Sequence, residues 1–240
     1  MKLSPHAFGS SKYKEDAPVF ELFQKKLEKM LADLAKIQNN HEKWGTVEII
    51  EGDNRSVDIS DHSLLPADLA ITSPPYLNNL DYTMQTGMEL FFLDFVENML
   101  DLRSLRKAMV ICDAKAMYKD VKDHKLVEQI DSIQKIILAL REVHKDKVWG
   151  WDYPFMTAQY FGGILRMLQN VKDMLKPGAR YVIVTGESAH SGVLVPVPDI
   201  TAELGQRAGF ALEEIIVHRT RKTSSHDYQL KECSVVLQRL

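Results

Sequence analysis

The residues best suited to chemistry in this chain are Thr72-Ser73-Pro74-Pro75-Tyr76, which follow an apolar run at 67–71. The run predicts a buried strand, and two consecutive prolines must end it, because proline lacks the N–H that a β-ladder needs. The turn is therefore stiff, with a hydroxyl before it and an aromatic ring after it. Ser73 and the freed carbonyls can accept hydrogen bonds from an amino group, and a planar base can stack on Tyr76. A plain Pro-Pro turn is the alternative interpretation.

Two further segments are candidates for binding. Gly186-Glu187-Ser188 follows the strand expected near 180–185, so it lies at the edge where open α/β sheets bind ligands. The basic segment 219–226 joins two predicted strands, and its hydroxyls and basic side chains can reach a phosphate backbone. Its basic residues are Arg219, Arg221, Lys222 and His226. An ordinary loop is the alternative for the first segment, and a solvated hairpin loop is the alternative for the second.

The elements that position these residues follow from hydrophobic periodicity. Residues 1–18 are polar and broken by prolines and a glycine, which predicts a loosely held arm. Apolar residues three and four apart predict an amphipathic helix from Val19 to Ile37. The other expected elements are parallel strands near 46–51, 67–72 and 180–185, a C-terminal pair of strands near 211–218 and 233–239, a helix over 156–175, and a helix over 199–208 with Asp199 as candidate cap.

The stretch from Met84 to Pro154 is helical in pattern and is too long for an ordinary crossover between strands. We interpret its part from about 98 to 154 as a helical insertion above the active edge of the sheet. The expected fold is therefore α/β, with residues 1–45 forming an arm and a helix, and residues 46–240 forming one domain.

Composition limits the classes of function. The chain of 240 residues has a net charge of −3, so any contact with nucleic acid must come from a local basic patch or from a partner. No apolar stretch reaches the roughly 18 residues needed to span a bilayer, so we expect no membrane segment. Cys112 and Cys233 have no metal-like spacing, which predicts no metal site and fits a reducing cytoplasm.

The Ser73-Pro74-Pro75-Tyr76 segment resembles the catalytic motif of the S-adenosylmethionine-dependent DNA amino-methyltransferases, which modify N4 of cytosine or N6 of adenine. The serine form resembles the N4-cytosine enzymes. The similarity continues through residues 77–82 and 89–93, and more weakly at the Lys176-Pro177-Gly178 turn. It covers roughly residues 46–240.

The resemblance implies a Rossmann-like methyltransferase sheet and a methylation reaction on DNA in a bacterial modification or defence system. It makes Ser73, Pro74, Pro75 and Tyr76 the catalytic segment, with acceptors at Ser73 and the Pro74 carbonyl and a base stacked on Tyr76. It places Asp53, Asn54 and Ser73 against the S-adenosylmethionine cofactor. Tyr82 and the basic residues of 219–226 are then expected at the nucleic acid. A plain turn is the alternative for residues 52–54.

One part of the family's pattern is missing from this sequence. These enzymes bind the cofactor through a glycine-rich turn, whereas the 12 glycines of this chain include no Gly-x-Gly. We therefore expect an incomplete sheet whose open edge is covered by a second chain, by a missing segment or by homo-oligomerisation.

A split or truncated enzyme is the favoured interpretation. A catalytically silent nucleic-acid-binding or partner-binding subunit is the alternative, and N6-adenine or RNA methylation are chemical variants.

Overall fold

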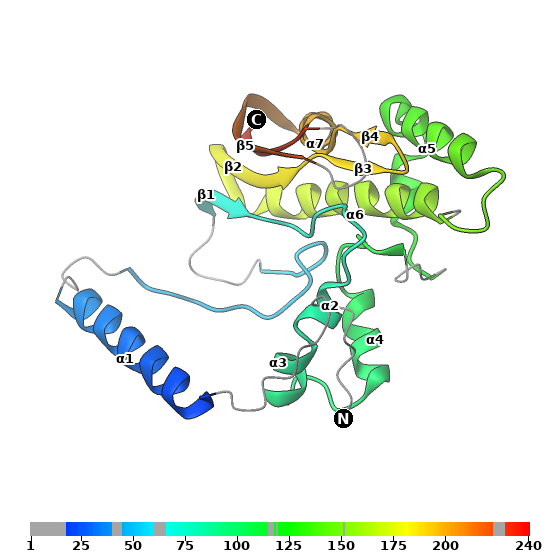
Figure 1. The fold of residues 1–240 in the computed structure, drawn as a ribbon. Coiled ribbons are helices and arrows are strands. Elements are labelled where there is room, and N and C mark those ends of the chain that lie inside the picture. Colours follow the sequence, from blue (N-terminus) through cyan, green and yellow to red (C-terminus); the bar gives the residue numbers. More distant parts are fainter. Residues whose placement is uncertain are drawn as a thin grey trace. The chain divides into compact units, whose positions relative to one another are not determined.

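The structure is a computed structural model that describes residues 18–39, 45–59, 66–114, 118, 120–150, 152–222 and 229–240. It divides into two compact units, Met1–Ile50 and Glu51–Leu240. The first unit contains helix α1, Val19–Gln38, which confirms the predicted amphipathic helix (Figure 1). None of the residues of α1 is buried.

The second unit is built on a four-stranded sheet in the order β1-β2-β6-β5. Strand β1, Ala67–Thr72, pairs in parallel with β2, Leu175–Gly186. Strand β6, Gln229–Arg239, pairs antiparallel with both β2 and β5, Phe210–Lys222. The α/β class, the strands at 67–72 and 180–185 and the C-terminal pair are confirmed. A separate two-stranded sheet joins β3, Ser188–His190, to β4, Val193–Val195.

The strand predicted near 46–51 is not present, because residues 45–51 have no strand pairing. Val47 and Ile49 are 82% and 93% exposed. A strand is held by hydrogen bonds to a neighbouring strand, and within the described residues β1 pairs on one side only, with β2. The alternating apolar pattern of this segment is typical of a strand, but among the described residues the segment pairs with no strand, not even with the open edge of β1.

One face of the four-stranded sheet is covered by α6, Tyr153–Asp173, and α7, Val197–Arg207, which also pack against each other (Figure 1). On β2, the side chains of Tyr181, Ile183 and Thr185 face these helices and are buried, whereas the alternate residues Val182 and Val184 are only half-buried. The core therefore lies between the sheet and these two helices.

Two details of the predicted elements need correction. The N-cap of α7 is Pro196, and Asp199 lies within the first turn of the helix instead of capping it. Lys176-Pro177-Gly178 is part of an irregularity inside β2, because Ala67 pairs with Leu175 and Leu69 pairs with Arg180. Gly178 has a φ of +79° there, which suits glycine.

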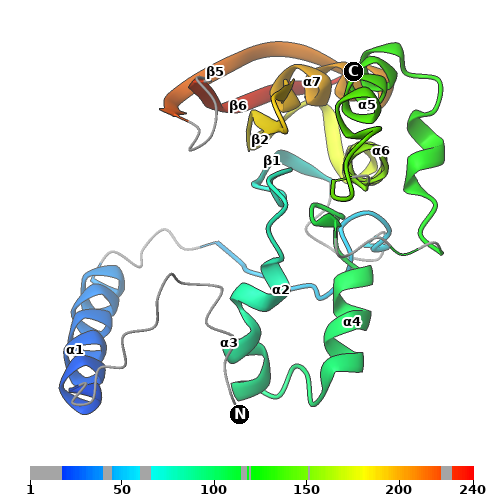
Figure 2. The ribbon, with the colours of Figure 1, turned by 45° about the vertical axis from the view of Figure 1, so that its right-hand side comes forward.

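Among its described residues, the helical region between β1 and α6 has five elements. They are α2, Tyr82–Gln85; α3, Gly87–Phe92; α4, Met99–Lys107; the 3₁₀ helix η4, Asp123–Val127; and α5, Asp131–His144. Helix α2 contacts both α3 and α4 (Figure 2), and α6 contacts both η4 and α5. None of the helices that the structure describes is long and apolar enough to cross a bilayer.

Gly162 in α6 permits the close approach of η4. A Cβ atom at this position would lie 2.0 Å from the backbone carbonyl oxygen of Asp123, a separation that side-chain rotation cannot relieve. Glycine is unfavourable inside a helix, so its place in α6 follows from this backbone contact. The contact fixes Asp123, whose side chain enters the site described below.

Candidate active site

The Ser-Pro-Pro-Tyr turn begins directly after β1, whose last residue pairs with Ile183 of β2. Ser73 is exposed, Pro74 is buried, and Pro75 and Tyr76 are half-buried. Burial raises the pKa of the Tyr76 hydroxyl, and a hydrogen bond with the Ser73 side chain opposes that rise. The motif thus presents a hydroxyl and part of an aromatic ring at the carboxyl end of β1, as the sequence predicts.

The end of β2 packs against the ring of Tyr76. A Cβ atom on Gly186 would lie 3.4 Å from Cε2 of Tyr76. The next residue, Glu187, joins this edge to β6, since its N–H donates to the Lys231 carbonyl at 2.8 Å and its Oε2 accepts from the Lys231 N–H at 2.8 Å. Residues 186–187 therefore support the motif, although the structure does not assign them a ligand.

The chain that follows the motif is held by several backbone contacts. Leu77 is fully buried, and its carbonyl accepts a hydrogen bond from Nε2 of His190 at 3.1 Å. Asn79 has a positive φ of 58°, and its Oδ1 accepts from the Ala114 N–H at 2.9 Å. Residues 77–79 are thus fixed from β3 and from the segment after α4.

Tyr82 is brought to the motif by the first turn of α2. Its hydroxyl accepts from the Tyr76 N–H at 3.2 Å. Asp81 caps this helix by accepting from the Met84 N–H at 3.2 Å, and it forms an ion pair with Arg106 of α4 at 2.8 Å. The hydroxyl of Thr83 also donates to Asp81 at 2.6 Å. The backbone of Tyr76 and the ring of Tyr82 are therefore one connected unit.

His190 supports the segment after the motif through its hydrogen bond to Leu77, and this contribution to stability depends on pH. Burial lowers its pKa to about 4 from the usual 6.5, so the neutral ring donates Nε2–H to Leu77 in the folded protein. The unfolded chain takes up a proton below pH 6.5, and stability must fall as the pH falls from 6.5 towards 4. We expect the free energy of unfolding to drop by about 2 kcal/mol from pH 7 to pH 5 through this group.

Urea unfolding of the chain at pH 7 and at pH 5 measures that drop. His190→Gln keeps an N–H donor but cannot titrate, so the difference between the two pH values should shrink by about 2 kcal/mol. An equal difference in the parent and the variant would show that His190 does not supply this pH dependence.

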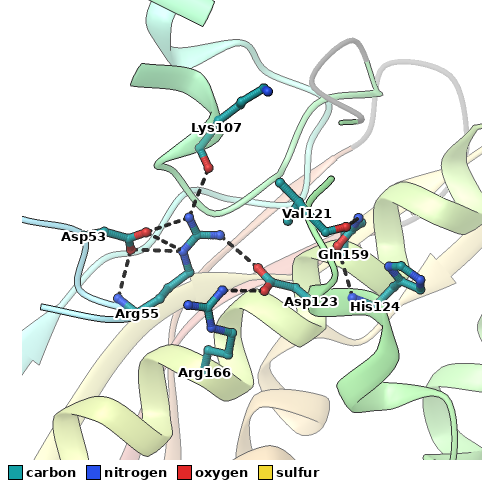
Figure 3. Close-up of polar contacts among 8 residues, drawn as sticks. All are labelled: Asp53, Arg55, Lys107, Val121, Asp123, His124, Gln159 and Arg166. Atoms are coloured by element: carbon teal, nitrogen blue, oxygen red, sulfur yellow. Dashed lines mark hydrogen bonds and ion pairs between the residues drawn. The ribbon is translucent and has the colours of Figure 1, made fainter. Parts of the chain in front are cut away.

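Asp53 lies in a network of charges with Arg55 and Asp123, and its own side chain is 20% exposed (Figure 3). Its Oδ1 accepts from the backbone N–H and Nε of Arg55 at 2.9 and 3.0 Å, and its Oδ2 accepts from Nε and Nη2 at 3.1 and 2.7 Å. Burial raises the pKa of Asp53, but the hydrogen bonds from Arg55 outweigh it and hold the pKa below its usual value. Three N–H groups of Arg55 thus occupy most of the roughly four acceptor sites of this carboxylate, since the Nε–H is shared by both oxygens.

Arg55 links Asp53 to η4 and α4, and Asp123 extends this network to α6. Nη1 of Arg55 donates to Oδ2 of Asp123 at 2.9 Å, and its Nη2 donates to the Lys107 carbonyl at 3.2 Å. Arg166 of α6 donates to Oδ1 of Asp123 at 2.7 Å (Figure 3). The side chains of Arg55 and Asp123 are 4% and 2% exposed. Nδ2 of Asn170 also donates to the carbonyl of Asn54 at 3.1 Å. These contacts hold residues 53–55 against the helices of the second unit.

A cleft of about 420 Å³ lies beside this network. It is lined by Arg55, Lys107, Asp120, Val121, Lys122, Asp123, Leu126 and Arg166. No residue of the motif at 73–76 lines it. The sequence did not single out Arg55 or Asp123, because they are separated by 68 positions and share no periodic pattern.

The basic residues 219–222 lie within strand β5, and not in the loop that the sequence predicted for them. A strand continues there because Arg219, Arg221 and Lys222 all pair with residues of β6. Arg219 forms an ion pair with Glu232 at 2.8 Å. The charges of Glu232 and Arg221 both act on the Tyr76 hydroxyl, so this end of the hairpin lies close to the motif. His226 lies outside the described residues.

Comparison with known proteins gives matches by sequence. No family model matches the chain. It is 28% identical over 164 residues to the Type II methyltransferase M.AvaI of Nostoc sp. and of Anabaena variabilis, over 66% of this chain and 34% of the relative. It is 27% identical over 189 residues to the Type II methyltransferase M.BsoBI of Geobacillus stearothermophilus, and this match covers 72% of this chain and 37% of the relative. The chain is thus similar in sequence to Type II methyltransferases.

The chain spans about a third of the length of the curated relatives it matches. The resemblance drawn from the Ser-Pro-Pro-Tyr segment is confirmed by them. A solved structure described as a DNA modification methylase of Thermus thermophilus overlaps 33% of this chain and 36% of its own, with a TM-score of 0.29 and 19% identity.

Proposed function

We propose that this chain carries the base-handling part of an S-adenosylmethionine-dependent DNA methyltransferase that modifies N4 of cytosine. The observation that carries the proposal is the intact turn at the end of β1, with Ser73 exposed beside a half-buried Tyr76. The homology to Type II methyltransferases supports the reaction class. The serine at the first position of the motif favours cytosine over adenine.

The turn suits the chemistry of an exocyclic amine. The lone pair of cytosine N4 is delocalised into the ring, so the amine is a poor nucleophile. Ser73 and the Pro74 carbonyl can each accept one of its N–H groups and push the nitrogen towards tetrahedral geometry. No strong base is needed at the start, because the amine proton becomes acidic only as the methyl group arrives. Positioning by a stiff turn supplies much of the rate enhancement.

The target base must leave the duplex before it can reach this turn, at a cost of a few kcal/mol. Tyr76 offers a surface on which the flipped base can stack. Arg221 and the neighbouring Lys222 extend the basic strand near the motif, where they can contact phosphate groups of the DNA. Tyr82, bonded to the Tyr76 backbone, holds the stacking residue in place.

S-adenosylmethionine, which supplies the methyl group in this reaction class, fits the residues of this chain only in part. The sequence has no Gly-x-Gly turn, and Arg55 occupies most of the acceptor sites of Asp53. Asp53 and Asn54 can therefore form at most one wall of a cofactor pocket, together with the edge at Ser73. The remaining walls must come from a second chain or from a further segment.

Strand β1 supports the same view of an incomplete enzyme. It lies at the edge of the described sheet, and Leu69 and Ile71 are 50% and 68% exposed. An open edge with apolar side chains is a surface to which another strand can add. We propose that a Rossmann-like methyltransferase sheet is completed beyond β1 by the part that carries the glycine-rich turn. A stable monomer that is fully active alone would contradict this proposal.

The test of the function is methylation of DNA by the completed protein. The chain is co-expressed with the part of M.AvaI that it does not match, and nucleosides from DNA exposed to the complex are analysed by mass spectrometry. We expect N4-methylcytosine only when both parts are present. N6-methyladenine alone would reject the cytosine assignment, and methylation confined to RNA would reject DNA as the substrate.

The cofactor assignment predicts a simple binding result. The isolated chain should bind S-adenosylmethionine weakly or not at all in isothermal titration, since an open pocket cannot bury most of a ligand's surface. Adding the complementary part should restore affinity and activity together. Tight binding by the isolated chain would mean that another segment, with Gly186-Glu187-Ser188 as the first candidate, has replaced the glycine-rich turn.

The pairing of Asp53 with Arg55 favours one alternative, a catalytically silent subunit that binds nucleic acid. Such a subunit would bind DNA with an affinity that falls steeply with salt, yet leave no methyl mark even with its partner present. The same co-expression experiment, read by both binding and mass spectrometry, separates the two functions.

A further inference from the structure

Helix α1 carries a seven-residue repeat of exposed apolar residues. Steps of three and four residues alternate along it, which places one residue at each a and d position of a heptad. These residues, with the exposed fraction of each, are Phe20 (88%), Phe23 (62%), Leu27 (41%), Met30 (50%), Leu34 (50%) and Ile37 (44%). Apolar residues at every a and d position are the pattern of a two-stranded coiled-coil seam. Three further exposed apolar residues, Val19, Leu22 and Leu31, lie at the g, c and e positions and widen the apolar face beside this seam.

The helix needs a partner over this seam. Most of the stability of helices in proteins comes from packing of their apolar face, and Pro18 at the N-cap of α1 offers no side-chain hydrogen bond. The pairs Lys25–Glu21 at 2.8 Å and Gln24–Glu28 at 2.9 Å lie on its exposed surface and add little. Burial of the seam is therefore the main source of stability that this helix can obtain.

The charges of α1 argue against a membrane surface as that partner. Its polar positions hold four lysines and three carboxylates, which leaves a net charge of +1. Helices that lie on membranes are rich in lysine and arginine along the polar face, because anionic lipids attract them. A nearly neutral polar face with an apolar seam fits a protein partner.

We infer that α1 pairs with α1 of a second copy of this chain, in antiparallel orientation. The flanking g positions hold Lys26 and Asp33. In an antiparallel pair g residues face g residues, so Lys26 of each copy faces Asp33 of the other copy, giving two pairs of opposite charge. In a parallel pair g faces e, and Lys26 would face Leu31 while Asp33 would face Gln38. The charge pattern thus selects the antiparallel dimer.

Contacts inside α1 leave these two charges available. Asp33 has an ion pair with Lys36 at 3.8 Å, in which both side chains are more than half exposed. Exposed pairs of this kind are worth little and exchange easily. The inference is independent of the proposed function, because it rests on α1 alone and uses no residue of the motif.

The experiment is sedimentation equilibrium of the full chain over a range of concentrations. We expect a reversible dimer. Leu27→Glu should raise the dissociation constant by at least about 100-fold, because each dimer loses two seam leucines. Ala32→Glu, at the outer f position of the same helix, is the matched control and should leave the constant unchanged. A chain that is monomeric at every concentration, or a dimer that persists in Leu27→Glu, would overturn the inference.

Charge reversal tests the orientation. Lys26→Asp should weaken the dimer by about tenfold, since it sets two pairs of like charge against each other. Adding Asp33→Lys to that variant should restore the parental constant. A double variant that remains as weak as the single one would exclude the antiparallel arrangement. Circular dichroism and the urea midpoint of the second unit check that each variant is folded.

Discussion

Replacing Ser73 with alanine is expected to lower the rate of methyl transfer by the completed enzyme about 100-fold. The exposed hydroxyl of Ser73 lies at the end of β1, where it can accept one N–H of the target amine. Removing one hydrogen-bonding group from a preorganised site typically costs about 10²–10³ in rate. Single-turnover kinetics with saturating DNA measures the loss at the chemical step.

The same assay tests the aromatic ring. Tyr76→Ala should remove a stacking contact worth about 1–3 kcal/mol, whereas Tyr76→Phe keeps the ring and loses only the hydroxyl bonded to Ser73. Because Ser73 is exposed and Tyr76 is half-buried, the urea midpoints of the variants should stay close to that of the parent. If Ser73→Ala and Tyr76→Ala methylate at the parental rate, the motif is only a turn.

Replacing Arg55 with methionine is expected to destabilise the chain by about 3–5 kcal/mol, because it leaves Asp53 and Asp123 without their shared cation. Arg55 is 4% exposed and donates to both carboxylates, while Asp123 retains only Arg166 in the variant. Urea unfolding at pH 7 measures the change.

Lys107→Met is the matched control for that variant. Lys107 pairs with Asp120 at 2.7 Å, but the two side chains are 37% and 66% exposed. A pair so open to water should contribute little to stability, so Lys107→Met should leave the urea midpoint close to that of the parent. Equal losses in Arg55→Met and Lys107→Met would contradict the view that burial makes the Arg55 network important.

The Arg55 network also has a defined pH dependence. The pKa of Asp53 lies below its usual 3.8 in the folded protein, so its contribution to stability is present above pH 3.8 and is lost as the pH falls through the folded value. In Arg55→Met the hydrogen bonds that lower this pKa are gone and burial raises it. The fall of the free energy of unfolding at acid pH should therefore begin at a higher pH in Arg55→Met than in the parent.

The sequence predicted those parts of the fold that depend on local pattern. The motif strand 67–72, the amphipathic helix from Val19 and the C-terminal hairpin are all periodic over several residues. The strand expected near 46–51 failed because pairing depends on a neighbour and not on the segment's own alternation. The basic run at 219–222 was predicted to be a loop because its charged residues lack the alternating apolar pattern of a strand. The run nevertheless continues to pair with β6.

The candidate site was predicted as far as its chemistry is contained in consecutive residues. Ser73 to Tyr76 could be found because prolines and an aromatic ring stand together. The support of that turn could not be found, since His190 reaches the Leu77 carbonyl across 113 positions. Gly162 was visible as an anomaly inside a helical pattern, but only the position of the Asp123 carbonyl explains it.

The place of β1 in the sheet has a consequence for its local stability. This strand has six residues and pairs only with β2 within the described part of the chain, whereas β2 is held on both sides. Segments with few partners open at a lower free energy than the core, and their amides exchange sooner. The strand that carries the reactive turn is therefore the part of the parallel pair that opens first. A strand added beyond β1 would slow that opening, so assembly and ordering of the reactive turn would occur as one event.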